Sequence, residues 1–293
     1  MPLDPRDHPG CRSDALEEMD LAGMRRRRLA AAALCLVFVL SGCGSQTLPS
    51  AAISPLASPT PTVEPTATPT PTASPSPSPS PTPVATTSDP PACRYDDLLT
   101  PYQTLDDWDR AFLDTIYRLS STYAPTDLVP TSKAGITGGG YVRAFVIADL
   151  KAMTAAAKAA GAGIQVRSAY RSYATQVTTF NYWKNLDGYK AALKVAARPG
   201  HSEHQLGTAI DFGSVAGAAP WNVADWATSK AGAWMKANAW KYGFVMSYPK
   251  GKTSSSCYSY EPWHYRYWGV ATAKIIHDSG LVPRVWLWRT SGH

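Results

Sequence analysis

Two short segments of the sequence combine histidine with carboxylate side chains, the residue types that bind divalent zinc. The first, GHSEHQLGTAID, contains His204 and Asp211, and the second, EPWH, contains Glu261 and His264. Two imidazole nitrogens and one carboxylate oxygen leave a position open for water, as in catalytic zinc sites. A neighbouring carboxylate can take the proton of such a water, and Glu261 lies three residues from His264. The sequence therefore predicts a hydrolytic site that holds one zinc ion.

Each of these residues also has a structural explanation when it is taken alone. His204 could be a structural or surface histidine, Asp211 a turn residue and Glu261 a surface charge. From Cys93 onward, however, Glu203 and Glu261 are the only glutamates, and both lie near histidines. We expect Glu203 itself to be exposed to solvent and His201 to lie at the rim of the pocket.

A third segment, Tyr170-Arg171-Ser172, precedes the other two. Together they resemble the VanY-type D-alanyl-D-alanine carboxypeptidases, zinc enzymes that trim peptidoglycan stem peptides. The family pattern is S-x-H-x-x-G-x-A-x-D, then E-x-W-H, with Y-R-S upstream. The resemblance covers roughly residues 150–269. It implies an α+β fold with a small antiparallel sheet and flanking helices, shared with hedgehog signalling domains and lysostaphin-type endopeptidases.

The resemblance also implies roles for individual residues around the site. His204, Asp211 and His264 match the metal ligands, and Glu261 matches the general base. Arg171 matches the arginine that holds the carbonyl oxygen as it becomes an oxyanion. Gln176 and Ser202 match positions that contact the terminal residue of the substrate. We also expect Tyr170 and Trp263 to contact the substrate, with Trp263 as a wall of the cleft.

The function that this resemblance implies is removal of the C-terminal D-alanine from peptidoglycan stem peptides. Two enzymatic alternatives remain open, because the motifs do not encode the shape of the pocket: L,D-carboxypeptidase action and endopeptidase cleavage of cross-links. A third alternative is a non-catalytic zinc module that binds cell-wall peptides, since a fold alone does not establish activity.

Residues 1–42 read as a secretory signal region. Four arginines precede Leu29–Leu40, an apolar run too short to span a bilayer about 30 Å thick. The sequence LSGC, which ends at Cys43, resembles a bacterial lipobox and implies a lipid anchor on that cysteine. A plain signal peptide is the alternative, and Met24 could be the true start because residues 1–23 are acidic and polar.

Residues 43–92 are predicted to form a disordered tether between the lipid and a single folded domain, residues 93–293. Fourteen of the 25 prolines lie between Pro49 and Pro91, among Ser, Thr and Ala. Such a segment buries too little apolar surface to offset the entropy of ordering. The expected location is extracytoplasmic, at the cell wall of a bacterium.

Export would place the folded domain in an oxidising compartment. Its two remaining cysteines, Cys93 and Cys257, are therefore expected to form a disulfide, with two buried thiols as the alternative. The domain carries 22 Lys and Arg against 14 Asp and Glu, which favours an anionic partner such as a wall polymer. Because it has no run of basic residues, we expect no nucleic-acid partner, and we expect a monomer.

Apolar spacing and glycine positions predict a mixture of helices and strands without a strict βαβ repeat, which indicates the α+β class. The helices are expected over 104–122, 141–160, 171–194 with a break near Gly188, 229–243 and, as the last, 271–278. The strands are expected over 163–168, 206–212, 244–246 and 263–267.

Overall fold

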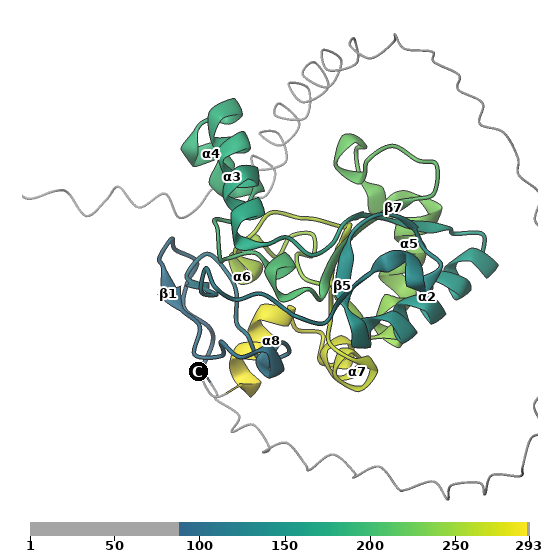
Figure 1. Cartoon of the computed structure of the whole chain (residues 1–293), viewed down its shortest axis with the longest axis horizontal. Helices are drawn as coiled ribbons and strands as arrows, with labels where there is room; N and C mark the ends of the chain where they lie inside the picture. Colours follow the sequence, from purple (N-terminus) through teal and green to yellow (C-terminus); the bar gives the residue numbers. More distant parts are fainter. Residues whose placement is uncertain (1–87, 292–293) are drawn as a thin grey trace, which may run out of the picture. The chain divides into compact units, whose positions relative to one another are not determined.

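The computed structural model describes residues 88–291 (Figure 1). The predicted signal region, Cys43 and residues 43–87 of the predicted tether lie outside the described residues. None of the helices within residues 88–291 combines the length and the apolar character that a bilayer crossing requires.

A five-stranded sheet lies at the centre of the domain. The edge strand β4 is parallel to its neighbour β6, and all other neighbouring strands are antiparallel, so the expected antiparallel sheet is found except at this edge. Together with the helices beside it, the sheet agrees with the predicted α+β class. In spatial order the strands are β4 (Thr137–Gly138), β6 (Ile164–Ser168), β7 (Ala209–Ser214), β9 (His264–Tyr267) and β8 (Phe244–Met246).

One face of this sheet carries the main hydrophobic core. Helices α2 (Ile147–Ala159) and α5 (Lys230–Asn238) cover it, and Figure 1 shows them together beside β7. The buried side chains on this face alternate along the strands, as expected for a half-buried sheet. They include Ile164, Val166, Ile210, Phe212, Tyr265 and Tyr267 from the strands and Leu150, Met153 and Met235 from the helices.

The alternating period of the strands turns a different set of side chains to the opposite face. Asp211, His264 and Arg266 all lie on that face and are buried. The N-terminal part of the domain covers it, because Arg266 donates hydrogen bonds to the carbonyls of Trp108 (2.7 Å) and Ala111 (3.1 Å). Polar groups beneath this cover must therefore satisfy one another.

The predicted helix over residues 104–122 is wrong. The segment forms the 3-10 turn η1 (Leu105–Asp107) and then the short strand β2 (Tyr117–Arg118), which pairs with β1 (Leu98–Leu99). The carboxylate of Asp114 accepts hydrogen bonds from the amides of Ile116 (2.7 Å) and Tyr117 (2.8 Å). This local turn competes with helix formation.

The remaining elements follow the predicted pattern more closely. The expected break at Gly188, where φ is +83°, separates α3 (Tyr173–Asp187) from α4 (Tyr189–Val195). Ser229 caps α5 by accepting a hydrogen bond from the Gly232 amide (3.0 Å). The chain continues as η7 (Ala239–Tyr242), and the strand expected at 206 starts later because the 3-10 turn η4 (Glu203–Leu206) precedes it.

Two further predictions differ from the structure. The helix expected from residue 141 begins only with α2, at Ile147. The residues before it form the strand β5 (Tyr141–Arg143), which pairs with β3 (Leu128–Pro130), and then the 3-10 turn η3 (Ala144–Val146). Helix α7 (Val270–Ser279) is not the last, because α8 (Pro283–Thr290) follows it with proline in its first position. The remaining short elements are the 3-10 turns η2 (Thr131–Ala134), η5 (Pro220–Asn222) and η6 (Trp226–Thr228) and the one-turn helix α6 (Thr253–Ser256).

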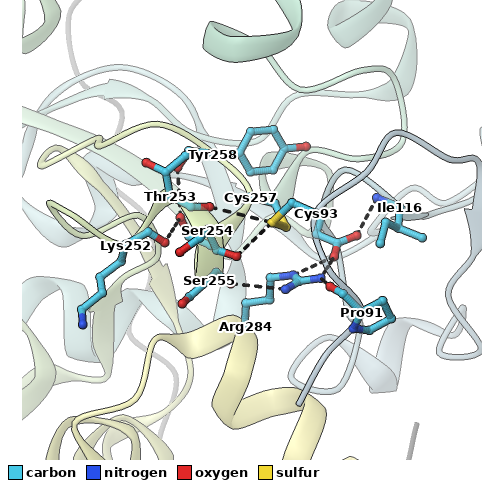
Figure 2. The surroundings of a disulfide bond; sticks show 12 residues. Pro91, Cys93, Ile116, Lys252, Thr253, Ser254, Ser255, Cys257, Tyr258 and Arg284 are labelled. Carbon is cyan, nitrogen blue, oxygen red and sulfur yellow. Dashed lines mark hydrogen bonds and ion pairs between the residues drawn. A yellow bond between two sulfur atoms is a disulfide. The ribbon is translucent and has the colours of Figure 1, made fainter. Parts of the chain in front are cut away.

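A disulfide joins Cys93 to Cys257 at the end of α6, across 164 positions of sequence (Figure 2). Beside it, the guanidinium of Arg284 on α8 binds the Asp114 carboxylate and donates to the carbonyls of Pro91 (2.9 Å) and Ser255 (3.3 Å). These contacts connect the start of the domain, α8 and the loop after α6.

The Cys257→Ser variant should unfold at lower temperature and denaturant concentration than the oxidised wild type. Opening a cross-link of this span should cost about 2–4 kcal/mol of the free energy of unfolding, because the unfolded chain gains freedom. Denaturant unfolding followed by circular dichroism measures the difference. The Cys93→Ser/Cys257→Ser double variant should match the single one, and equal stability of wild type and variants would contradict the contribution of the cross-link.

Candidate active site

Three side chains from two neighbouring strands and one turn meet on the polar face of the sheet. The antiparallel register of β7 and β9 pairs Asp211 with His264, and His204 lies in η4, just before β7. Each of the three residues is buried, and their ligand atoms all lie within 4.8 Å of one another. This geometry could hold a metal ion.

The imidazole of His204 is held in one orientation by a backbone contact. Its Nδ1 lies 2.7 Å from the Ala169 carbonyl oxygen, an acceptor only, so Nδ1 carries the proton and Nε2 faces Asp211 Oδ2 at 3.2 Å. The turn that carries His204 is capped by the Ser202 hydroxyl and ends at Gly207, where φ is +76°. Glycine adopts this left-handed conformation without steric cost.

The second imidazole, His264, lies between two carboxylates. Its Nδ1 is 3.0 Å from Asp211 Oδ1, and its Nε2 is 2.8 Å from Glu203 Oε2. The expectation that Glu203 is exposed to solvent is therefore wrong. Its side chain is only 7% exposed and also accepts a hydrogen bond from the Ser247 hydroxyl at 2.6 Å.

The expectation that His201 lies at the rim of the pocket is wrong as well. Its ring is fully buried beneath the N-terminal segment, where Nδ1 contacts the Asp114 carbonyl (2.7 Å) and Nε2 contacts the Asp97 carboxylate (2.9 Å). His201 thus ties η4 to the segment that covers the polar face.

Without a metal ion, the groups of the site differ widely in their protonation. Burial and the charge of Arg171 lower the pKa of His204 to about 4. Burial opposes charge on His264, but its hydrogen bonds to Asp211 and Glu203 outweigh this and raise its pKa to about 10. In spite of burial, the contacts with the two imidazoles lower the pKa of Asp211, and the hydrogen bond with His264 and the charge of Arg266 lower the pKa of Glu203 to about 2. The metal-free site therefore holds two carboxylates and one imidazolium.

This set of donors fits a divalent ion such as zinc. One carboxylate oxygen of Asp211 faces Nε2 of His204, and the other faces Nδ1 of His264. The second nitrogen of each imidazole contacts a hydrogen-bond acceptor, the Ala169 carbonyl for His204 and the Glu203 carboxylate for His264. Zinc binds neutral imidazole and carboxylate, and outer acceptors of this kind fix the tautomer of its histidine ligands.

Arg171 extends the site away from the two histidines. Its Nη1 lies 3.9 Å from Asp211 Oδ2, and its Nε donates to Gln176 Oε1 at 3.0 Å. Hydroxyl groups of Ser168 (3.1 Å) and Ser202 (3.4 Å) complete its contacts. The guanidinium is therefore fixed, and Gln176, which also donates to the backbone from its buried amide, supports it.

A cleft of about 240 Å³ opens onto these groups. Glu261 lines it with Oε2 4.0 Å from His264 Nδ1, and Trp263 forms part of its wall. Ser202 and Gln176 also line the cleft, whereas Tyr170 is not among its lining residues.

The cleft has walls that the sequence analysis missed. Tyr248 stacks on the His264 ring at 4.8 Å, and Trp221 packs edge-on against Trp263 at 6.1 Å. Trp183 of α3 lies in the lining with them. Tyr248 and Trp221 lie in segments without a motif, so nothing in the neighbouring sequence indicates that they line the cleft.

Residues 139–270 of the chain match the family VanY, D-alanyl-D-alanine carboxypeptidase. The solved structure of the LdcB LD-carboxypeptidase is 32% identical, with a TM-score of 0.57 over 67% of this chain and 96% of LdcB. The chain belongs to the VanY carboxypeptidase family. The solved VanY D,D-pentapeptidase, a complex with Zn(II), is 27% identical, with a TM-score of 0.52 over 61% of this chain and 99% of that one.

A curated relative of this VanY-family chain is the protein YodJ of Bacillus subtilis (strain 168). The two are 39% identical over 175 residues, which cover 58% of this chain and 64% of YodJ. The chain thus spans less than two thirds of the length of this relative. The fold that the resemblance implies, that of the hedgehog and D-Ala-D-Ala peptidases, is confirmed by the solved structures.

Zinc affinity should rise with pH, because the ion must displace the proton that His264 holds below its pKa of about 10, whereas His204, with a pKa of about 4, is already neutral. We expect an increase of about tenfold per pH unit between about pH 6 and 8. Calorimetry in buffers of different ionisation enthalpy should count about one released proton per ion. An affinity independent of pH would contradict this protonation state.

The Asp211→Asn variant should lose most of the zinc affinity, because both oxygens of the carboxylate face imidazole nitrogens. Zinc should raise the melting temperature of the wild type, since a ligand that binds only the folded state stabilises it, and should not raise that of the variant. The exposed Asp278 provides a control, because Asp278→Asn should respond to zinc as the wild type does. Equal zinc shifts in all three proteins would exclude Asp211 as a ligand.

Proposed function

We propose that this protein is a zinc-dependent carboxypeptidase that removes the C-terminal D-alanine from peptidoglycan stem peptides. The observation that carries the proposal is the presence of Glu261 and Arg171 in one cleft with the His204–Asp211–His264 cluster. A module that only bound zinc and peptide would require neither an acid-base group nor a fixed cation beside the ligands.

In this proposal His204, Asp211 and His264 hold one zinc ion, which acts as a Lewis acid and lowers the pKa of water. Glu261 accepts the proton of the attacking water at its carboxylate and later donates it to the nitrogen of the departing D-alanine. Arg171 stabilises the negative charge that develops on the scissile carbonyl oxygen.

The terminal residue of the substrate is held, in this proposal, by polar groups of the same cleft. Gln176 and Ser202 both contact Arg171, so a terminal residue bound by them lies beside the cation that steadies the oxyanion. Trp263 forms the wall together with Trp221. Support for a D-Ala-D-Ala terminus comes from the solved VanYB structure, a complex with D-alanine-D-alanine, 26% identical to this chain with a TM-score of 0.52.

An L,D-carboxypeptidase is the second candidate, because LdcB, the neighbour with the TM-score of 0.57, is named an LD-carboxypeptidase. Digestion of defined penta- and tetrapeptide muropeptides separates the candidates by product mass. Loss of alanine from the pentapeptide alone indicates D,D-activity, and loss from the tetrapeptide indicates L,D-activity. Cleavage of a cross-linked muropeptide dimer, digested in parallel, indicates an endopeptidase, and peptide binding without turnover indicates a non-catalytic module.

We further propose that residues 1–42 direct export, that Cys43 carries a lipid and that residues 43–92 tether the domain, as a monomer, within the cell wall. The sequence LSGC and the proline-rich composition support this. Mass spectrometry of the mature amino terminus tests the anchor. A lipid-modified Cys43 is expected, and an unmodified terminus would contradict it.

The Glu261→Gln variant should lose turnover by at least about 100-fold while it retains zinc, because proton transfer contributes about this much or more and Glu261 is not a proposed ligand. Release of D-alanine and zinc content are measured on the same preparations. Asp278→Asn is the control that should turn over normally. Turnover by the Glu261 variant at the wild-type rate would exclude it as the general base.

The Arg171→Met variant should lower kcat by about 100- to 1,000-fold, because a fixed cation beside a developing oxyanion acts chiefly on the transition state. KM should change much less than kcat, and steady-state kinetics with a pentapeptide separate the two. The exposed Arg94, which pairs with Asp96 at 3.6 Å, provides the matched control Arg94→Met. A change confined to KM would assign Arg171 to ground-state binding instead.

A further inference from the structure

Glu203 occupies an unusual environment for a carboxylate outside the proposed catalytic groups. It lies directly before His204 in η4, and its side chain turns away from the cleft into the protein. There Oε2 lies 2.8 Å from His264 Nε2 and 2.6 Å from the Ser247 hydroxyl, and Oε1 lies 3.3 Å from Arg266 Nη1.

We propose that Glu203 is a positioning residue that fixes His264 in the tautomer with its proton on Nε2. A carboxylate is an acceptor only, so the nitrogen that contacts Glu203 must be the donor. Asp211 contacts Nδ1 in the same way, so a bound ion takes the place of the Nδ1 proton, and the neutral ring then keeps its proton on Nε2. This inference rests on the proposed zinc site and assigns a role to a residue outside the ligand set.

The two histidines of the cluster are oriented by different means. His204 donates from Nδ1 to a backbone carbonyl and presents Nε2, whereas His264 donates from Nε2 to a side chain and presents Nδ1. A backbone carbonyl cannot be removed by substitution of a side chain. The orientation of His264 therefore depends on the identity of residue 203, and that of His204 does not.

The position of Glu203 is itself fixed by buried partners. Arg266 lies two residues after His264 on β9, is 1% exposed, and has Trp108 and Ala111 as carbonyl acceptors and the Trp268 ring at 4.0 Å. Because these contacts hold the guanidinium of Arg266 in place, it provides a fixed positive charge beside the Glu203 carboxylate. The N-terminal segment that covers this face thus supports the cluster of proposed metal ligands, because it holds Arg266, Arg266 holds Glu203, and Glu203 holds His264.

The test uses the full-length chain and two readouts that do not require catalysis. The first is zinc affinity, measured by competition with a chelator, and the second is the tautomer of each histidine in the zinc-loaded protein, measured by nitrogen-15 NMR of the imidazoles. For Glu203→Ala we expect an affinity about 10- to 100-fold lower and loss of the single Nε2–H form of His264, with His204 unchanged.

Glu203→Gln keeps an oxygen acceptor of the same shape, so it should keep the Nε2–H form and lose less affinity than Glu203→Ala. This isosteric variant also keeps the proposal testable if the alanine variant does not fold. The control is Asp278→Asn, which changes an exposed carboxylate that contacts Lys274 and His277 and neither histidine of the cluster, and which should change neither readout.

Wild-type affinity and an unchanged His264 tautomer in Glu203→Ala would overturn the positioning role. Loss of affinity in Glu203→Ala together with an unchanged tautomer would also overturn it, because the effect would then be structural. Failure of the wild type to bind zinc would instead contradict the proposed function, so the two failures are distinguishable.

Discussion

The antiparallel pairing of β7 with β9 is the constraint on which the site depends. It sets Asp211 opposite His264 on the face of the sheet that is not packed against α2 and α5. Because side chains alternate along a strand, a shift of one residue in this register would exchange these groups with the core residues Ile210 and Tyr265. The core residues on one face therefore determine where the ligands lie on the other.

The polar face is stable because its charges are paired and its hydrogen bonds are largely satisfied within the protein. His264 lies between Asp211 and Glu203, and Glu203 is paired in turn with Arg266. A buried charge without a partner would be strongly destabilising, so these groups must fold as one network. A bound divalent ion would take the place of the proton that His264 holds in the metal-free network.

The sequence predicted the central part of this arrangement because the chemistry concentrates in short motifs. His204, Asp211 and His264 could be named from residue type and spacing, and the strands around them from apolar alternation. Glu203 was misjudged because its partners Ser247 and Arg266 come from β9 and the loop before it, distant in sequence, and local context favoured exposure.

The N-terminal segment was misjudged for a related reason. Its apolar residues recur with helical spacing, but in the structure they belong to different clusters, with Phe112 packed near Trp268 and Leu113 near Leu206. The spacing of apolar residues alone cannot show whether they form one buried face of a helix or are divided between two hydrophobic clusters. Likewise, nothing in its sequence indicates that this segment covers Arg266 and buries His201.

The most direct test of the central claim is the position of the metal itself. Crystals of the zinc-loaded protein should give a single anomalous difference peak at the zinc absorption edge, in contact with His204, Asp211 and His264, and with Nδ1 as the ligand atom of His264. A zinc peak that lies elsewhere, or the absence of a peak among these three side chains, would contradict the account.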